Sequence, residues 1–194
     1  QLPSSGELTV EADREVIVAI EGDIQKTYTD FVVLAERERF VSKTKSSQQQ
    51  TIFTLCGKQI NDAGIDILAR VLNQPAVGPH LQTLDLSRNT FQAHGATVLI
   101  SQILRSNSIM HLKNLDLAGN GSLGSEGMRI ICEALPRTRL VTISLADCAL
   151  TEAHMPPLVD SLMTCREEGA SLEKVDLDGN DISDDAAHEL LVAS

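Results

Sequence analysis

A nine-residue pattern, Leu-x-x-Leu-x-Leu-x-x-Asn, recurs along this chain and constrains its fold more than any other feature. The third apolar position of the pattern repeats after 31, 31, 28 and 32 residues. Self-similarity at a fixed period predicts a solenoid, in which each repeat buries its apolar face against its neighbours. The copies end, in order, at Lys58, Asn89, Asn120, Cys148 and Asn180.

Each copy is followed by apolar residues at helical spacing. After Asn89, for example, Phe91, Gly95 and Leu99 lie four residues apart, which marks one face of a helix. A repeat slightly longer than the usual span of about 20–29 residues has room for a strand and a full helix. The sequence therefore predicts an α/β solenoid, a horseshoe segment of about five repeats, with parallel strands on the concave face and helices on the convex face.

The last position of the pattern lies where the chain turns from strand to helix. An Asn there can bond exposed backbone groups of its own turn and of the neighbouring turn, and Cys148 should be a weaker substitute. Gly64, Gly95 and Gly127 are expected to let each helix lie close to the sheet. The fourth repeat has two prolines instead, which predict a late helix start, at about Pro157.

These motifs carry a family resemblance. Residues 51–194 resemble the ribonuclease-inhibitor-like class of leucine-rich repeats, which alternates a strand with a helix and admits Asn or Cys at the turn. The resemblance implies the α/β solenoid fold. It implies no single activity, because the class includes enzyme inhibitors, activators of small GTPases, immune receptors and actin-capping proteins, and fold does not determine function.

The chain is acidic in both its repeats and its N-terminal part. The net charge is −11, of which −8 falls within residues 51–194 and −3 within residues 1–50. Such a charge repels nucleic acid and anionic membrane and attracts cationic proteins. No apolar run approaches the roughly 18 residues of a membrane span, and the acidic first twenty residues do not fit a signal peptide. We therefore expect an intracellular protein, cytoplasmic or nuclear, that binds neither nucleic acid nor membrane.

Residues 1–50 do not follow the repeat. Residues 15–20 and 30–42 form apolar-centred segments, the second with a helical pattern, and the polar residues 42–50 predict a linker. Two interpretations stay open: a cap over the exposed edge of the first repeat, or a piece of an upstream domain. We favour the cap, and we expect the repeat domain to cover residues 51–194.

Two short motifs suggest ligand sites and are better explained by the repeat. The glycines in residues 119–124 match a dinucleotide fingerprint, but no βαβ unit of the right kind surrounds them, and they fit the turn of a repeat. Residues 176–180 resemble the start of a calcium loop. Asp181 and Ala187 occupy the loop positions that require Gly and Glu, so this motif also fails.

Catalytic and metal-binding arrangements are absent from the sequence pattern. The four cysteines form neither a zinc spacing nor a redox pair, and we expect reduced structural thiols. The five histidines fall mainly in linkers and helix starts, with no nucleophile and acid in register. The sequence therefore predicts a protein that is not an enzyme and uses no cofactor and no metal.

The strand positions predict three rows of side chains on the concave face. Residues between the last two apolar positions point outward, and they are Thr54, Asp85, Asp116, Ser144 and Asp176. The next row is Cys56, Ser87, Ala118, Ala146 and Asp178. The row beside the turn is Gly57, Arg88, Gly119, Asp147 and Gly179. Because neighbouring strands lie about 4.8 Å apart, Asp85 and Asp116 should face and repel each other.

Two explanations of this acidic row stay open. Asp is common at this position of leucine-rich repeats, so the residues could simply be solvated; alternatively, they form an acidic stripe for a basic partner. The small residues Ser87, Ala118 and Ala146 leave a shallow floor for a helix or an extended tail. Since the rows contain no aromatic hot-spot residue, we expect salt-sensitive, rapidly associating contacts.

The sequence thus predicts a protein-interaction module or scaffold that binds a basic protein segment. The expected contact residues are Asp85, Asp116, Ser144, Asp147, Asp176 and Asp178, with Arg88 on the same surface. The alternative is a regulatory domain that acts on another enzyme as a GTPase activator or an inhibitor, with Arg88 dominant. A third possibility is a structural assembly element that uses the helices or the solenoid ends. The sequence indicates neither the identity of the partner nor an oligomeric state.

Overall fold

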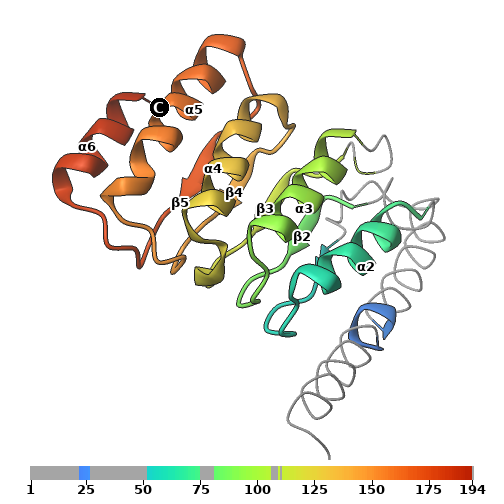
Figure 1. Ribbon diagram of the computed structural model, residues 1–194. Helices are drawn as coiled ribbons and strands as arrows, with labels where there is room; N and C mark the ends of the chain where they lie inside the picture. The colour runs from blue at the N-terminus through green and yellow to red at the C-terminus, as the bar shows by residue number, and fades with distance from the viewer. Residues whose placement is uncertain (1–21, 27–51, 75–80, 106–108, 110, 194) are drawn as a thin grey trace, which may run out of the picture.

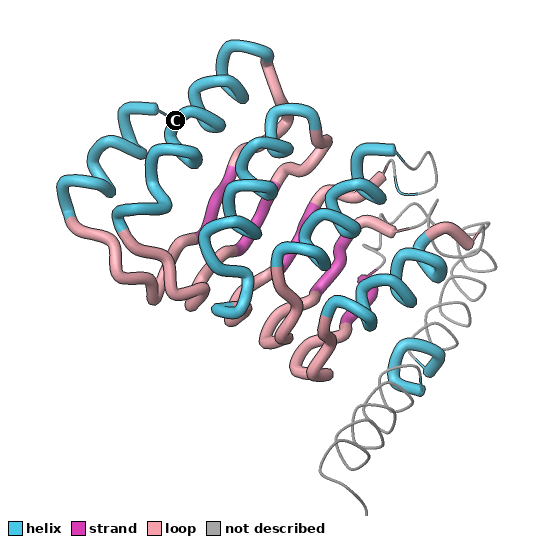
Figure 2. The backbone as a smooth tube through the Cα atoms, in the orientation of Figure 1, coloured by secondary structure: helices cyan, strands magenta, loops and turns pink. Residues whose placement is uncertain are grey.

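The computed structural model describes residues 22–26, 52–74, 81–105, 109 and 111–193. Strands and helices alternate, and the strands form one five-stranded parallel sheet in sequence order. Figures 1 and 2 show the helices together on one side of this sheet. The predicted α/β leucine-rich repeat solenoid is confirmed. Its elements are β1 (Ile52–Thr54), α2 (Asp62–Leu72), β2 (Thr83–Asp85), α3 (Ala93–Arg105), β3 (Asn114–Asp116), η3 (Gly121–Leu123), α4 (Gly124–Ala134), η4 (Leu135–Arg137), β4 (Thr142–Ser144), η5 (Glu152–His154), α5 (Met155–Glu168), β5 (Lys174–Asp176) and α6 (Asp184–Ala193).

The strand register aligns the repeats along one hydrophobic core. The central residue of each strand pairs with the central residue of the next and points toward the helices. In the first four strands this residue is almost completely buried, whereas in β5 it is half-buried. The aligned residues are Phe53, Leu84, Leu115, Ile143 and Val175. Burial of a large apolar side chain contributes about 1.5–3 kcal/mol, so this column is a principal source of stability.

A ladder of buried asparagines holds each turn to the turn before it. Asn89 Nδ2 donates to the carbonyl oxygens of Leu55 (2.9 Å) and Leu86 (2.8 Å). Its Oδ1 accepts from the backbone N–H groups of Lys58 (3.1 Å) and Ile60 (2.9 Å). One side chain therefore satisfies backbone groups of two adjacent repeats that would otherwise be buried without partners, as the sequence predicts.

Asn120 and Asn180 repeat this arrangement, and Cys148 reproduces only part of it. The Cys148 thiol donates to the carbonyl oxygen of Leu117 at 3.2 Å. The thiol has no oxygen that could accept from the preceding turn, so it is the weaker substitute that the sequence predicts. Asn180 in turn bonds the N–H groups of Cys148 and Leu150 and the carbonyl of Leu145, which restores the ladder one repeat later.

The helix glycines have a different role from the one expected. A Cβ atom on Gly95 would lie 2.6 Å from Asp62 Oδ1, which accepts a hydrogen bond from the Gly95 N–H group. A Cβ atom on Gly127 would lie 3.2 Å from Leu123 Cδ2 and 3.5 Å from Ala93 Cα. The close neighbours thus belong to the start of the preceding helix and to the segment just before the glycine's own helix, not to the sheet. A glycine here lets successive helices approach, which corrects the expectation.

The helix of the fourth repeat begins late, as predicted: α5 starts seven residues after Cys148, whereas α3 starts four residues after Asn89. Its first residue is Met155, two residues before the predicted Pro157, because both prolines fit in the first turn, where backbone N–H groups have no helical acceptor. The short turn η5 precedes it. His154 Nδ1 accepts the Thr151 N–H at 3.0 Å, and the Thr151 side chain completes a capping box. His154 is therefore a capping residue.

Within residues 1–50 the structure describes 22–26, which are helical. Ile24 is buried in the main core, and Asp23 Oδ2 lies 3.4 Å from Lys58 Nζ of the first repeat. This short helix therefore contacts the start of the repeat domain, while the choice between cap and upstream segment stays a prediction. Outside the described residues lie the segment predicted at 15–20 and all of residues 27–51, including the helix predicted at 30–42 and the linker predicted at 42–50.

The asparagine ladder makes a prediction for stability. Replacing Cys148 with Asn should raise the free energy of unfolding by about 1 kcal/mol, because the amide adds hydrogen bonds to both adjacent turns. Chemical denaturation followed by circular dichroism measures the change. The matched control, Cys148→Ser, offers one short donor and should stay closer to the wild type. A Cys148→Asn variant less stable than the wild type would contradict this account.

Candidate protein-binding face

The strand register confirms the predicted acidic row of the concave face, which consists of Thr54, Asp85, Asp116, Ser144 and Asp176. Asp85 on β2 is the register partner of Asp116 on β3, and Ser144 on β4 is the partner of Asp176 on β5. Thr54 on β1 completes the row beside Asp85. The three aspartates are half-buried. Two like charges thus face each other across one step of the sheet, which is unfavourable without a cation or a screening partner.

Each aspartate of this row also closes the end of its own strand. In every case Oδ1 accepts a hydrogen bond from the backbone N–H two residues later, a local bond that Asp and Asn make readily. This bond gives Asp a structural reason to occupy the position, whatever the face binds. The bonds join Asp85 to Ser87 at 3.0 Å, Asp116 to Ala118 at 2.9 Å and Asp176 to Asp178 at 3.2 Å.

The three carboxylates differ in how many further donors they have. Asp85 Oδ1 also accepts from the Ser87 hydroxyl at 2.7 Å, and Asp176 Oδ2 accepts from the Ser144 hydroxyl at 3.1 Å. For Asp116, the described residues provide the single backbone bond and no side-chain donor. The carboxylate on the central strand is therefore the one with the greatest unmet capacity to accept from a cationic ligand.

The row beside the turn requires a left-handed backbone in every repeat. Its five residues have φ between 52° and 72°, a region that favours glycine. Arg88 and Asp147 adopt it despite their side chains, each at a cost of about 1–2 kcal/mol. The remaining members are Gly57, Gly119 and Gly179.

Side chains and glycines alternate along this row for a steric reason. A Cβ atom on Gly119 would lie 3.0 Å from Arg88 Cγ, and one on Gly179 would overlap the Asp147 carboxylate. Each of these two side chains therefore extends over the glycine of the next repeat. Arg88 and Asp147 are both exposed, so the turn edge of the concave face carries one positive and one negative group, two strands apart.

The concave face has a further row that the repeat pattern did not predict. Side chains two residues before the acidic row share its face, and they are Ile52, Thr83, Asn114, Thr142 and Lys174. Asn114 Nδ2 donates to Thr83 Oγ1 at 3.0 Å, and Thr142 Oγ1 donates to Asn114 Oδ1 at 2.8 Å. The alternation of strand side chains is the signal that could have identified this row.

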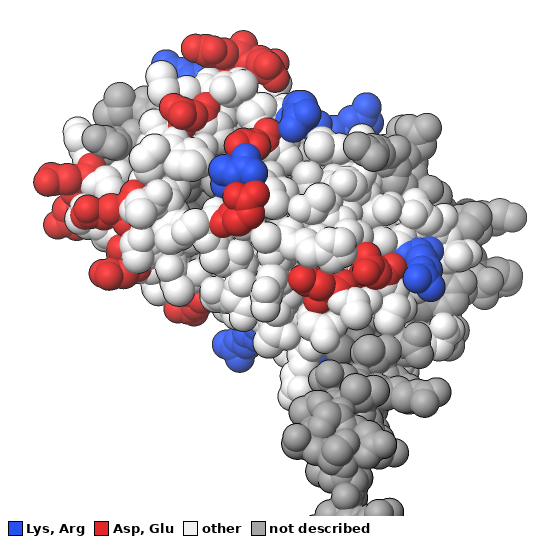
Figure 3. Space-filling model, in the orientation of Figure 1, with Lys and Arg blue, Asp and Glu red and all other residues white. Residues whose placement is uncertain are grey.

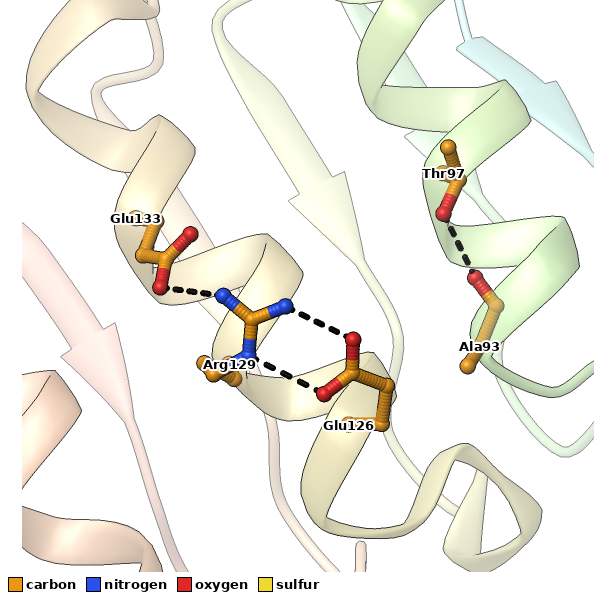
Figure 4. A network of polar contacts seen from close by, with 5 residues as sticks. All are labelled: Ala93, Thr97, Glu126, Arg129 and Glu133. Atoms are coloured by element: carbon orange, nitrogen blue, oxygen red, sulfur yellow. Dashed lines mark hydrogen bonds and ion pairs between the residues drawn. The ribbon is translucent and has the colours of Figure 1, made fainter.

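Within the described residues, several acids of the helix side form ion pairs, whereas the aspartates of the concave rows do not. Among the described residues, no ion pair within 4 Å involves an aspartate of the concave rows. On the helix side, Figure 3 shows acidic and basic groups interspersed, with acidic groups prominent near α6. Figure 4 shows Arg129 on α4 between Glu126 and Glu133, and this guanidinium holds the pKa of Glu126 below its usual value.

The end of the solenoid carries an apolar hollow of about 670 Å³. It lies beside β5 and α6, and most of its leucine and valine side chains are only partly covered, whereas Leu190 is buried. Its apolar lining includes Leu162, Leu172, Val175, Leu177 and Leu190. This hollow is the feature relevant to the assembly alternative, and its lining includes none of the concave aspartates.

In the part of the chain that the structure describes, no three His, Cys, Asp or Glu side chains group in a way that could hold a metal ion. No helix of residues 22–26, 52–74, 81–105 and 111–193 combines the length and apolar character that crossing a bilayer requires.

Comparisons with known proteins agree with this geometry. A family profile described as Leucine Rich repeat matches residues 79–99, 108–132 and 170–191. Human "NACHT, LRR and PYD domains-containing protein 13" is 31% identical over 144 residues, covering 74% of this chain and 13% of that protein. Pig "Ribonuclease inhibitor" is 35% identical over 136 residues, covering 69% of this chain and 28% of the inhibitor. Bovine "NACHT, LRR and PYD domains-containing protein 3" is 27% identical over 154 residues, covering 78% of this chain and 14% of that protein.

The fold and the strand-lined face define an α/β leucine-rich repeat protein. The profile and the relatives carry this further: the chain belongs to the ribonuclease-inhibitor-like class of leucine-rich repeats. It spans about an eighth to a quarter of the length of the relatives it matches. Protein–protein interaction is the general role of such domains, and what this chain binds is a matter for proposal.

The steric alternation of the turn row can be tested by stability. Gly179→Ala should lower the free energy of unfolding by about 2 kcal/mol, because alanine is strained at φ 71° and overlaps Asp147. Asp147→Gly in the same chain should recover about half of that loss, since the overlap disappears while the strain remains. Thermal unfolding of the wild type, both single variants and the double variant measures the coupling. If the effects of the two substitutions on the free energy of unfolding were additive, the steric coupling between Asp147 and Gly179 would be contradicted.

Cysteine reactivity provides a second test of the fold and a reporter for the face. Burial raises the pKa of Cys132 to about 12 and also raises the pKa values of Cys148 and Cys165, so these thiols should resist alkylation. Cys56 is partly exposed in the concave rows. Iodoacetamide at pH 8 should modify Cys56 first, with all four thiols reacting after denaturation, as mass spectrometry would measure. Equal native reactivity of the four would contradict the structure.

Proposed function

We propose that this chain is a non-enzymatic protein-interaction module that binds a basic protein segment through the acidic rows of its concave face. The observation that carries the proposal is the adjacency of Asp85 and Asp116, which lack an ion-pair partner among the described residues. A Lys or Arg head group between them would relieve their repulsion and gain a charge-assisted hydrogen bond.

The surrounding residues support the same proposal. Ala118 and Ala146 have short side chains, so a ligand side chain could approach the Asp116 carboxylate without steric obstruction. Asp147, Asp176 and Asp178 extend the negative surface toward β5. Ser144 belongs to the same row, where it donates to Asp176. A net charge of −11 would increase the association rate of a cationic partner at low salt.

The regulatory alternative depends on a different residue. Arg88 is exposed and adopts a strained backbone conformation, and strain of this kind accumulates at functional positions. A module that acts on another enzyme could use this guanidinium at the turn edge, and the name of the pig relative says that it is an inhibitor of ribonuclease. The proposed setting for either role is intracellular, cytoplasmic or nuclear, and the four free thiols fit a reducing compartment.

Affinity capture from cell extract at about 50 and 300 mM salt tests the proposal. The bait variant changes Asp85, Asp116 and Asp176 to Asn, which retains an oxygen for each local backbone bond while removing the charges. We expect the wild type to retain a basic partner at low salt. The amount captured should fall at least tenfold in the variant, because salt screening and charge removal both weaken the attraction between the aspartates and the partner's basic groups.

A matched control has the same change in charge on the helix side. Asp160→Asn, Glu167→Gln and Glu168→Gln alter three exposed acids of α5 and should leave capture unchanged. Arg88→Gly distinguishes the regulatory alternative, and glycine is preferred to alanine because φ is 56° there. If the α5 control lost the partner to the same extent, the loss would be explained by net charge and not by the concave face. An unchanged set of captured partners in the concave variant would refute the proposal.

A further inference from the structure

We infer that the concave face takes an extended peptide rather than a helix, and that Asn114 binds its main chain. This inference rests on the proposed function and deepens it, because it specifies the conformation and side-chain order of the bound segment. The observations that carry it are the hydrogen bonds of the first concave row, defined by Ile52, Thr83, Asn114, Thr142 and Lys174.

The Asn114 side chain is held in one orientation from both sides. Its Nδ2 donates to Thr83 Oγ1 on β2, and its Oδ1 accepts from Thr142 Oγ1 on β4. An Asn amide has two N–H donors and a carbonyl with two lone pairs, so one donor and one acceptor position stay available. Because the residue is half-buried on an outward-facing row, this pair is presented to the concave side at fixed geometry, which lowers the ordering cost of binding.

One donor beside one acceptor matches the main chain of a single extended residue. The N–H and the C=O of one residue point to the same side of an extended chain, whereas in the middle of a helix these groups already bond within the helix. Thr83, Asn114 and Thr142 are uncharged, so a main chain crossing this row would not need to neutralise a charge. The ladder therefore favours an extended segment that crosses the strands.

The neighbouring row fixes where a basic side chain would fall. Asp116 follows Asn114 by two residues on the same strand and the same face, at about 6.6 Å along the strand. A Lys or Arg side chain can span that distance from a main chain lying on the first row. Its head group would then lie between Asp85 and Asp116, the register partners of the acidic row.

The two ends of the first row differ and give the peptide a polarity. Ile52 on β1 is 50% exposed, and Lys174 on β5 is also exposed. Five strands span about 19 Å and an extended chain rises about 3.3 Å per residue, so roughly seven residues cross the sheet. Alternate residues face the surface. The fitting peptide has an apolar residue at position 1, a basic residue at position 3 and a carboxylate at position 7.

The test uses fluorescence anisotropy with a labelled seven-residue peptide that has Leu at position 1, Lys at position 3, Glu at position 7 and Ser elsewhere. A second probe is the same peptide with an N-methyl group on residue 4, which removes the N–H that would lie over β3. The variants are Asn114→Val, which suits a strand, the brace variant Thr83→Val with Thr142→Val, and Asp85→Asn with Asp116→Asn. Circular dichroism checks that each variant folds.

The expected results separate main-chain binding from charge. Asn114→Val should weaken the unmodified probe at least tenfold at both low and high salt, and the brace variant should weaken it about threefold. The N-methyl probe should bind the wild type about tenfold more weakly. Asn114→Val should then weaken the N-methyl probe less than it weakens the unmodified probe, because one of the two main-chain hydrogen bonds is already absent. The aspartate variant should remove the salt-dependent part of binding.

Three outcomes would overturn the inference. Equal binding of the two probes by the wild type would exclude main-chain recognition. Loss of binding in the aspartate variant but not in Asn114→Val would refute the extended-peptide inference, while the proposed binding of a basic segment by the acidic face would still hold. Failure of the wild type to bind the unmodified probe at 1 mM would refute the specified segment, whereas the proposed function fails only if capture of a basic partner is also independent of the aspartates.

Discussion

The fold depends on one interaction, the hydrogen bonding of a buried turn amide to the turn of the repeat before it. Strands of three residues offer few backbone bonds of their own, so they need turns whose groups are satisfied elsewhere. Asn89 bonds carbonyls of two repeats and N–H groups of the preceding one. The turns therefore stack in register, and strand register, core alignment and concave rows all follow from that stacking.

The concave aspartates combine a structural and a potential binding role on different atoms. One carboxylate oxygen closes the strand end, as in Asp116 with the Ala118 N–H group. The other oxygen is free to meet a ligand, except where a neighbouring hydroxyl already bonds it, as Ser144 does for Asp176. A residue common at this position for local reasons can thus become a binding residue in the repeats whose neighbours leave it unsatisfied.

The repeat pattern predicted the sheet, the strand order and the pairing of Asp85 with Asp116, because a fixed period with alternating side chains leaves one compatible register. It predicted the late start of α5 but placed it two residues too far along the chain, since prolines are tolerated at more than one position of a first turn. It predicted that Gly95 lets its helix approach the sheet. The actual close neighbour of Gly95 is Asp62 Oδ1, which lies 33 residues away in sequence, and a contact over that distance cannot be read from the local pattern. The bonds of Asn114 depend on rotamers, which a sequence pattern does not specify.

The alternation of glycine and side chain along the turn edge limits how this surface can vary. A residue larger than glycine at one repeat occupies the space above the next, as Arg88 does over Gly119. Substitutions at adjacent positions are therefore coupled, and the edge can carry a new functional group only at every second repeat, about 9.6 Å apart. Any repertoire of binding specificities built on this edge has half as many independent positions as it has repeats.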